Sequence, residues 1–264
     1  MSEWLAYLAI GAVVGFAAGL LGVGGGIFLV PLLVWVFTAH ALPAEHVLHL
    51  AIGTALAAMV FTSIASMRAH HGHGAVDWKI ARAMSPGMLA GSFVAALIAG
   101  LIPTRPLAVG FTLLVFYAAT QILLDLKPPG SRELPGAAGL FGAGVVIGAV
   151  SSLLAAGGAF MTIPFLAWCK VPLRRAIGTA AANGLPIAIA GTAGYLLNGL
   201  RTPDLPALSV GYIYLPALVF VVTTSMLAAP LGARLAHRLP VKRLRTIFAC
   251  LLYVFAVRMV VSVW

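Results

Sequence analysis

Charged side chains are scarce in this sequence. Only 8% of the 264 residues are charged, with 16 Lys and Arg against six Asp and Glu, whereas a soluble domain carries about a quarter. Hydrophobic residues make up 62% of the chain, and its mean hydropathy is +1.07. This composition predicts an all-α polytopic membrane protein. Because one helical crossing needs roughly 20 apolar residues, the chain has room for at most about eight crossings and for no soluble domain.

Carboxylates are the rarest charged groups, and none falls well inside an apolar span. The six lie in loops or at span ends, at Glu3, Glu45, Asp77, Asp125, Glu133 and Asp204. This placement excludes a carboxylate proton relay at mid-membrane. Cys169 and Cys250 have no metal-ligand spacing around them and are interpreted as structural thiols. Because the spans hold no paired carboxylates, metal set or nucleophile beside a base, we expect no enzyme, no cofactor and no bound metal.

Long apolar runs are abundant. Eight of them are separated by short polar stretches, at residues 4–38, 47–67, 79–101, 106–126, 137–168, 176–198, 206–233 and 244–264. The first run is interrupted by five glycines between Gly19 and Gly26, and a related interruption lies in the fifth. The arms of the first run, about 16 and about 12 residues long, are each too short to span a bilayer.

The two interruptions belong to an internal repeat. Three blocks recur in the same order, residues 19–31 as 152–164, 51–54 as 176–179, and a helix ending in Pro103 as one ending in Pro240. Within the first block, Gly24 and Gly25 correspond to Gly157 and Gly158. The sequence therefore predicts two transmembrane repeats, residues 1–126 and 137–264, joined by a linker at 127–136.

The distribution of Lys and Arg predicts how the interrupted runs sit in the membrane. If all eight runs cross, the loop cations divide six against nine. If the first and fifth runs are re-entrant helical hairpins, only Arg105 and Arg201 lie on one side and 13 lie on the other, as the positive-inside rule favours. Each repeat then has a hairpin plus three crossings, and the second repeat is inverted relative to the first. Both termini face outward, and the cytoplasmic loops are 68–79, 127–136, 169–175 and 234–245.

The glycine clusters are the first candidate for a binding site. Glycine tolerates positive φ and close backbone approach, so each cluster can turn the chain tightly and start a half-helix. The unpaired N–H groups at a helix N-terminus attract an anion. The expected substrate-binding residues in the two clusters are Gly24, Gly25, Gly26, Gly157, Gly158 and Ala159. The alternative is that the glycines only allow close helix packing.

Three polar residues inside the spans extend this candidate site. Thr54 and Thr179 occupy equivalent places in the two repeats, where their hydroxyls can either donate to substrate oxygens or bond back to their own helices. Asn183 is the only amide well inside the sixth run, and in lipid it needs a partner, either the substrate or a neighbouring helix.

Two basic features are interpreted as peripheral. The histidines at 70, 71 and 73 lie near a single carboxylate, Asp77, which favours a cytoplasmic interface loop over a metal cluster. Arg258 is six residues from the end of the chain, so its side chain can reach the membrane surface.

Several of these motifs together resemble a known family. The glycine-rich turn ending in Pro31, its echo ending in Pro164, the two Ala-Ile-Gly-Thr blocks and the stretch at residues 74–78 are similar to the TauE/SafE sulfite exporters, also called toluenesulfonate uptake permeases. The resemblance covers essentially the whole chain. It implies a bacterial inner-membrane carrier of small sulfur-containing anions such as sulfite, sulfoacetate and other organosulfonates. The sequence departs from the family pattern at the second turn, which has Ala155, Ala156 and Ala159 where glycines are frequent, and after the two threonines, where Ala55 and Ala180 replace a frequent serine.

The expected function is secondary transport by alternating access between two inverted repeats, with export implied by the resemblance. Because no carboxylate lies at mid-membrane, we expect downhill movement or exchange rather than tight proton coupling. The alternatives are a carrier of another small anion, such as thiosulfate or a carboxylate, and an anion channel. The expected partners are a small anionic substrate and the lipid bilayer. Nucleic acid is not expected, because the basic residues lie in short loops between apolar spans.

Overall fold

The computed structural model describes residues 3–21, 25–124, 130–236 and 241–263. The fold is that of an all-α membrane protein, and the described residues form ten helices and one two-stranded sheet. In chain order the elements are α1 (Glu3–Leu21), α2 (Gly26–Ala39), α3 (Val47–Gly72), α4 (Trp78–Ala99), α5 (Thr104–Leu124), α6 (Ala137–Leu153), α7 (Ala159–Trp168), α8 (Leu173–Gly199), β1 (Ser209–Val210), β2 (Ile213–Tyr214), α9 (Leu215–Ala236) and α10 (Val241–Val263).

Three of the described helices, α3, α4 and α8, are long and apolar enough to cross a membrane. Shorter apolar stretches lie in α1, α2, α6, α7, α9 and α10. An 18-residue apolar stretch of each helix is buried inside the protein to 78% in α3 and to 61% in α8, against 50% in α4. Of the three, α3 and α8 are therefore the most enclosed by neighbouring helices.

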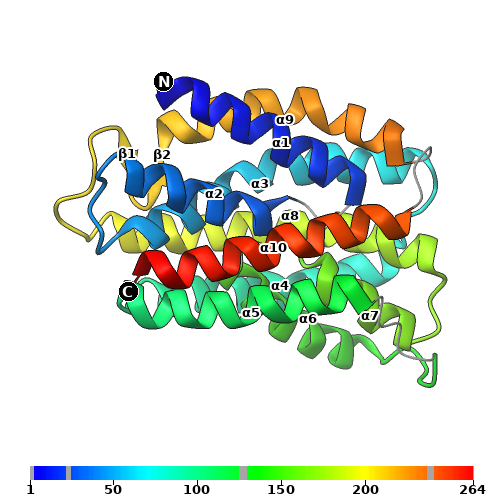
Figure 1. Cartoon of the computed structure of the whole chain (residues 1–264). Coiled ribbons are helices and arrows are strands. Elements are labelled where there is room, and N and C mark those ends of the chain that lie inside the picture. Colours follow the sequence, from blue (N-terminus) through cyan, green and yellow to red (C-terminus); the bar gives the residue numbers. More distant parts are fainter. Residues whose placement is uncertain (1–2, 22–24, 125–129, 237–240, 264) are drawn as a thin grey trace.

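The first and fifth apolar runs are each broken into two helices, as the sequence predicts. In Figure 1 both chain termini lie at the left end of the bundle; α1 runs away from that end and α2 returns to it. The α6–α7 hairpin instead opens toward the right end, where α3 ends and α4 begins. The predicted loops at 127–136 and 234–245 lie partly outside the described residues.

The sequence missed a small sheet at the start of the seventh apolar run. Residues 206–233 were expected to form one apolar segment, but β1 and β2 precede α9 and pair antiparallel, Ser209 with Tyr214 and Val210 with Ile213. Gly211 between the strands has φ +57°, which glycine adopts without the steric cost of a side chain.

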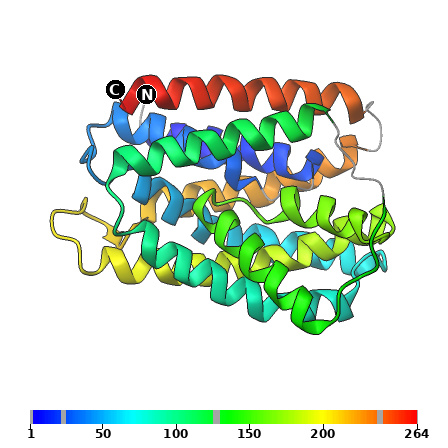
Figure 2. The same ribbon diagram turned by 90° about the horizontal axis from the view of Figure 1, so that it is seen from below.

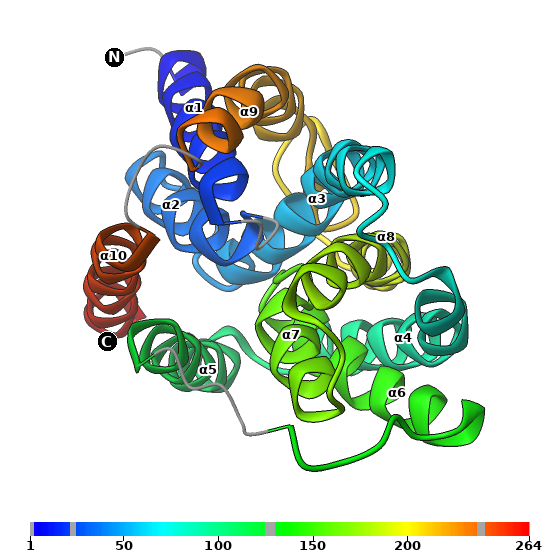
Figure 3. The same ribbon diagram turned by 90° about the vertical axis from the view of Figure 1, so that its right-hand side faces the viewer.

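The helices pack as two clusters and one separate helix pair, and each cluster contains helices from both the N-terminal and the C-terminal half of the chain. The first cluster contains α1, α2, α3 and α9, and the second contains α6, α7, α8 and α4. Helices α3 and α8 join the clusters, while α5 and α10 lie side by side (Figures 2 and 3). Each cluster thus takes one helix from the other end of the chain: α9 packs on α1, and α4 packs on α6.

Glycines make the closest of these contacts possible. A Cβ on Gly11 of α1 would lie 2.6 Å from the Val221 carbonyl oxygen of α9, and one on Gly148 of α6 would lie 2.6 Å from the Met88 carbonyl oxygen of α4. Both helix pairs therefore pack backbone against backbone, which small residues allow in membranes.

We predict that Gly148→Ala destabilises the α4–α6 contact. The added methyl has to displace backbone atoms rather than a flexible side chain, and overpacking of this kind costs about 1–3 kcal/mol. Gly142→Ala is the matched control on α6, because its Cβ would meet no atom within 4 Å. Thermal unfolding of the purified protein in detergent should show a lower Tm for Gly148→Ala alone. Equal Tm values for the two variants would contradict this packing.

Candidate functional site

Two left-handed glycines mark the breaks in the interrupted runs. Gly25 is the N-cap of α2, with φ +69° and ψ −21°, and Gly158 is the N-cap of α7, with φ +72° and ψ −14°. A residue with a side chain is strained in this region. The glycines therefore turn the chain and start a new helix, as the sequence predicts for Gly158 and Gly25. Gly24 lies outside the described residues.

Each turn presents the beginning of a helix to the protein interior. The carbonyl oxygen of Gly158 accepts hydrogen bonds from the N–H groups of Met161 at 3.1 Å and Thr162 at 2.8 Å. In the described part of the chain, the N–H groups of Ala159 and Phe160 donate to no backbone carbonyl. These two donors and the positive end of the α7 dipole are what an anion would meet.

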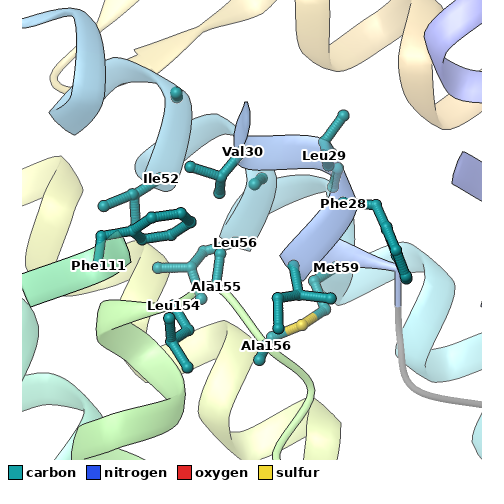
Figure 4. Packing of buried hydrophobic residues seen from close by; sticks show 14 of the residues in the cluster. Phe28, Leu29, Val30, Ile52, Leu56, Met59, Phe111, Leu154, Ala155 and Ala156 are labelled. Atoms are coloured by element: carbon teal, nitrogen blue, oxygen red, sulfur yellow. The ribbon is translucent and has the colours of Figure 1, made fainter. Parts of the chain in front are cut away.

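The two turns lie against each other near the middle of the bundle. Gly26 packs on the carbonyl oxygen of Ala155, leaving no room for a Cβ. Residues 154–160 are all buried. Figure 4 shows Ala155 and Ala156 beside Leu56 and Met59 of α3, near the start of α2. In this conformation Gly25 and Gly26 of the first turn and residues 154–160 of the second are buried from solvent.

Two hydroxyls lie beside the second turn without a hydrogen-bond partner. A Cβ on Gly158 would lie 3.6 Å from Ser151 Oγ and 3.6 Å from Thr162 Oγ1. Both residues are fully buried, and among the described atoms neither hydroxyl has a partner. An unpaired buried polar group costs about 1–3 kcal/mol, so two of them beside one turn need an explanation such as an ordered water or a bound ligand. The sequence analysis did not identify Thr162 as a site residue.

Asn183 is also fully buried and incompletely bonded. Its Nδ2 donates only to the thioether sulfur of Met84 on α4, at 3.6 Å, and its Oδ1 has no partner among the described atoms. Next on α8, Gly184 lies near the second turn, where its Cβ would be 3.4 Å from the Gly157 carbonyl oxygen. The backbone of α8 next to the expected amide therefore lies close to the turn, and the amide itself is partly paired with a neighbouring helix.

Thr54 and Thr179 have a different environment from the turns. Thr54 Oγ1 accepts a hydrogen bond from the Tyr214 N–H at 2.9 Å, and Thr179 Oγ1 accepts one from the Asp77 N–H at 3.0 Å. Both threonines are fully buried. They attach the start of α9 to α3 and the start of α4 to α8. Among the described residues neither hydroxyl bonds back to its own helix, which was one of the two alternatives; each oxygen instead accepts an N–H group of another element.

A cavity of about 770 Å³ opens at the end of the bundle where the termini lie. Its lining includes Val34 and Thr38 of α2, the exposed Arg105, and a buried histidine, His49. His49 Nε2 lies 3.1 Å from the Ala99 carbonyl oxygen and 3.0 Å from that of Ile102, so this nitrogen carries the proton and donates. His49 was not identified from the sequence, since nothing in its spacing marks it.

The family follows from comparison with known proteins. Residues 7–259 match the family described as sulfite exporter TauE/SafE. The chain belongs to the sulfite exporter TauE/SafE family. It is a membrane transporter.

Relatives of this TauE/SafE chain carry general names. It is 35% identical to a probable membrane transporter protein of Haemophilus influenzae, covering 96% of both chains. It is 27% identical to the probable membrane transporter protein YdhB of Bacillus subtilis, covering 86% of this chain and 87% of the relative. A relative in Methanocaldococcus jannaschii, probable membrane transporter protein MJ0441, is 24% identical over 96% of this chain and 93% of its own length. No solved structure matches the chain.

Two of the residues that were interpreted as peripheral, His71 and His73, make structural hydrogen bonds in this TauE/SafE chain. His71 Nδ1 accepts from Trp78 Nε1 at 3.1 Å, and His73 Nδ1 donates to the Ala69 carbonyl oxygen at 2.7 Å. In the described ranges no group of three or more His, Cys, Asp or Glu is placed to hold a metal ion. Burial raises the pKa of the Cys169 thiol, at the end of α7, which disfavours the reactive thiolate. Arg258 is exposed on α10.

We predict that Thr179→Val loosens the start of α4. Valine keeps the shape of threonine but leaves the Asp77 N–H unpaired, at a cost of about 1–3 kcal/mol. Hydrogen exchange at the Asp77 amide should become faster, whereas Thr179→Ser, which retains the acceptor, should preserve the protection. Thr54→Val should have the same effect on the Tyr214 amide. Unchanged exchange at both amides would show that these bonds do not hold the helix starts.

Proposed function

We propose that the protein is a secondary transporter, with export implied by its family, of small sulfur-containing anions such as sulfite, sulfoacetate or other organosulfonates. The anion binds at the buried junction of the two glycine turns. The observation that carries this proposal is that α2 and α7 both begin at left-handed glycines and that the start of α2 packs, in the interior, on the Ala155 carbonyl oxygen just before the start of α7. The sulfur class of the anion follows from the description of the family.

In this proposal the binding residues are Gly24, Gly25 and Gly26 of the first turn, Gly157, Gly158 and Ala159 of the second, and Asn183. A helix N-terminus stabilises an anion by about 0.3–1 kcal/mol when exposed and by up to ~2 kcal/mol when partly buried. Thr54 and Thr179 act indirectly, because their oxygens hold the starts of α9 and α4.

We further propose that the chain is built from two inverted repeats, 1–126 and 137–264. Paired positions support this. Gly11 and Gly144, which are aligned when Gly25 is aligned with Gly158, make the same kind of contact with a carbonyl oxygen in the α1–α9 and α6–α4 pairs. Gly53 and Gly178 likewise pack on the carbonyl oxygens of Tyr212 and Ala75, beside the two threonine bonds. In Figure 1 the hairpins α1–α2 and α6–α7 open toward opposite ends of the bundle.

Alternating access in this architecture moves the two helix clusters, not the two sequence halves. The contacts of α1 with α9 and of α6 with α4 tie each hairpin to a helix from the other repeat. A rigid-body motion preserves such backbone contacts and changes the contact between the clusters, which α3 and α8 make. Burial of the turns supports a carrier with a closed intermediate over an open channel.

The cavity at the terminal end marks the proposed route from the outer side. It reaches Val34 of α2, eight residues after Gly26, and eight residues of helix span about 12 Å. Opening the contact between the clusters near His49 and Ala99 would connect this cavity with the turns.

The proposed topology follows from the basic residues. Arg68, Lys79 and Arg174 lie at the end of the bundle opposite the termini, and the positive-inside rule assigns that end to the cytoplasm of a bacterial inner membrane. Both termini are then periplasmic, and loops 68–79, 127–136, 169–175 and 234–245 are cytoplasmic.

We predict that Gly158→Ala abolishes transport. The residue would have to keep φ near +72°, and its Cβ would lie 2.6 Å from Ile187 Cδ1, so the start of α7 would shift away from the anion. The measurement is uptake of labelled sulfite and sulfoacetate by proteoliposomes, relative to the unaltered protein. Gly25→Ala is expected to have the same effect at the first turn.

The control for backbone strain is Gly74→Ala. Gly74 also has positive φ, +62°, but its Cβ would meet no atom within 4 Å. It should therefore lose about 1–2 kcal/mol of stability and keep its transport rate. Full transport in both Gly158→Ala and Gly25→Ala would refute a site at the turns, and single-channel currents in the unaltered protein would favour a channel.

Labelling from outside the cell tests the topology. In a variant with Cys169 and Cys250 replaced by serine, Gly72→Cys and Ala207→Cys place thiols on exposed residues at opposite ends of the bundle. A membrane-impermeant maleimide added to intact bacteria should label Ala207→Cys. It should label Gly72→Cys only after the membrane is permeabilised. The reverse pattern would overturn the orientation.

A further inference from the structure

The two glycine turns have different chemical environments although they are echoes of each other. Aligning Gly25 with Gly158 places Ala18 opposite Ser151 and Leu29 opposite Thr162. Aligning the block at 51–54 with that at 176–179 places Ala58 opposite Asn183. At all three positions an apolar residue of the first repeat is replaced by a polar residue in the second.

The first of these environments is a small apolar cavity. It measures about 10 Å³, and its lining includes Ala18, Gly25, Leu29 and Ala58. This is about the space of one water molecule. Both hydroxyls of this lining are bonded within their own helices, Thr62 to the Met59 carbonyl oxygen at 3.3 Å and Ser225 to that of Val222 at 3.1 Å. Nothing in this lining offers an anion a free side-chain donor among the described residues.

The second environment contains polar side chains that the protein leaves unpaired. Ser151 Oγ and Thr162 Oγ1 each lie 3.6 Å from the Cβ position of Gly158, and Asn183 retains an N–H after its bond to the Met84 sulfur. All three residues are fully buried, and each has an unpartnered oxygen among the described atoms. The N–H groups of Ala159 and Phe160, which donate to no described backbone carbonyl, lie at the same turn, at the start of α7.

These donors are all uncharged. Among the buried residues that the structure describes there is no Lys, Arg, Asp or Glu, and the one buried histidine, His49, lines the cavity at the terminal end. The local field comes instead from the start of α7, equivalent to roughly half an elementary charge. Desolvation grows with the square of an ion's charge, so a doubly charged anion loses about four times as much hydration as a singly charged one. Hydrogen bonds from uncharged donors therefore compensate the hydration lost by a singly charged anion far better than that lost by a doubly charged one.

We propose that the second turn alone supplies side-chain ligands to the anion, where Ser151, Thr162 and Asn183 bind a singly charged oxyanion group, such as a sulfonate, in preference to a doubly charged one, such as sulfate. This inference rests on the proposed transport function. It assigns the side-chain contacts to one turn and one helix cluster. The first turn contributes only backbone groups to the site and packs against Ala155.

Methanesulfonate and sulfate are suitable probes, because both are tetrahedral sulfur oxyanions that differ in charge. Their binding to the full-length protein in detergent is measured by calorimetry, and their flux is measured in proteoliposomes. The variants are Ser151→Ala and Thr162→Val. Thr62→Val is the matched control, since it makes the same exchange at the first turn, where the hydroxyl is already bonded within its helix.

The expected result has three parts. The unaltered protein binds methanesulfonate at least about tenfold more tightly than sulfate. Ser151→Ala and Thr162→Val each weaken methanesulfonate binding by about tenfold or more, while Thr62→Val leaves it unchanged. The two site variants keep or raise the Tm, because each removes a buried hydroxyl that has no partner. A merely structural role for these hydroxyls would lower the Tm and leave binding intact.

Other outcomes overturn the inference, and they separate it from the proposed function. Methanesulfonate transport that survives both site variants would place the anion elsewhere while leaving the transporter proposal standing. Equal binding of sulfate and methanesulfonate would refute the selection by charge. If the unaltered protein neither binds nor transports these anions, sulfite or sulfoacetate, the proposed function fails and this inference fails with it.

Discussion

The contact between the two glycine turns is the constraint on which the rest of the structure depends. Gly26 lies directly on the Ala155 carbonyl oxygen, so two breaks that are far apart in the sequence meet backbone to backbone in the interior. Chain without helical hydrogen bonds is tolerated at membrane depth only where protein surrounds it. The burial of residues 154–160 meets that requirement, and the helices around the turns are arranged to provide it.

That enclosure depends on helices exchanged between the two parts of the chain. Helix α9 packs on α1 and α4 packs on α6, and each exchanged helix is held at its start by a threonine of the enclosed helix beside it. The two Ala-Ile-Gly-Thr blocks therefore have the same structural role, each attaching the start of an exchanged helix to the enclosed helix beside it. Glycine allows the approach of a loop, and the threonine oxygen then accepts one of its N–H groups. A cluster built in this way can move as a unit, because its strongest contacts are internal.

The sequence predicts the breaks, their left-handed glycines and the eight apolar runs, because these depend on local composition. It does not predict the partners of Thr54 and Thr179, which lie 160 and 102 positions away. The same limit explains why His49 and Thr162 were missed: one is defined by a cavity and the other by the absence of a bonding partner. The sheet β1–β2 was missed because two-residue strands leave no periodic signal.

The unpaired groups at the second turn give a physical reason for coupling between ligand and conformation. In the closed state without a ligand, the hydroxyls of Ser151 and Thr162 are buried and unsatisfied, at a cost of about 1–3 kcal/mol each. Opening the turn to water removes this cost, and so does an anion that accepts both hydrogen bonds. On the proposed function, the anion therefore stabilises the closed state relative to the open one, and a ligand shifts such an equilibrium only by its difference in affinity for the two states. Closure around an empty site remains unfavourable, which is the condition that exchange of one anion for another requires.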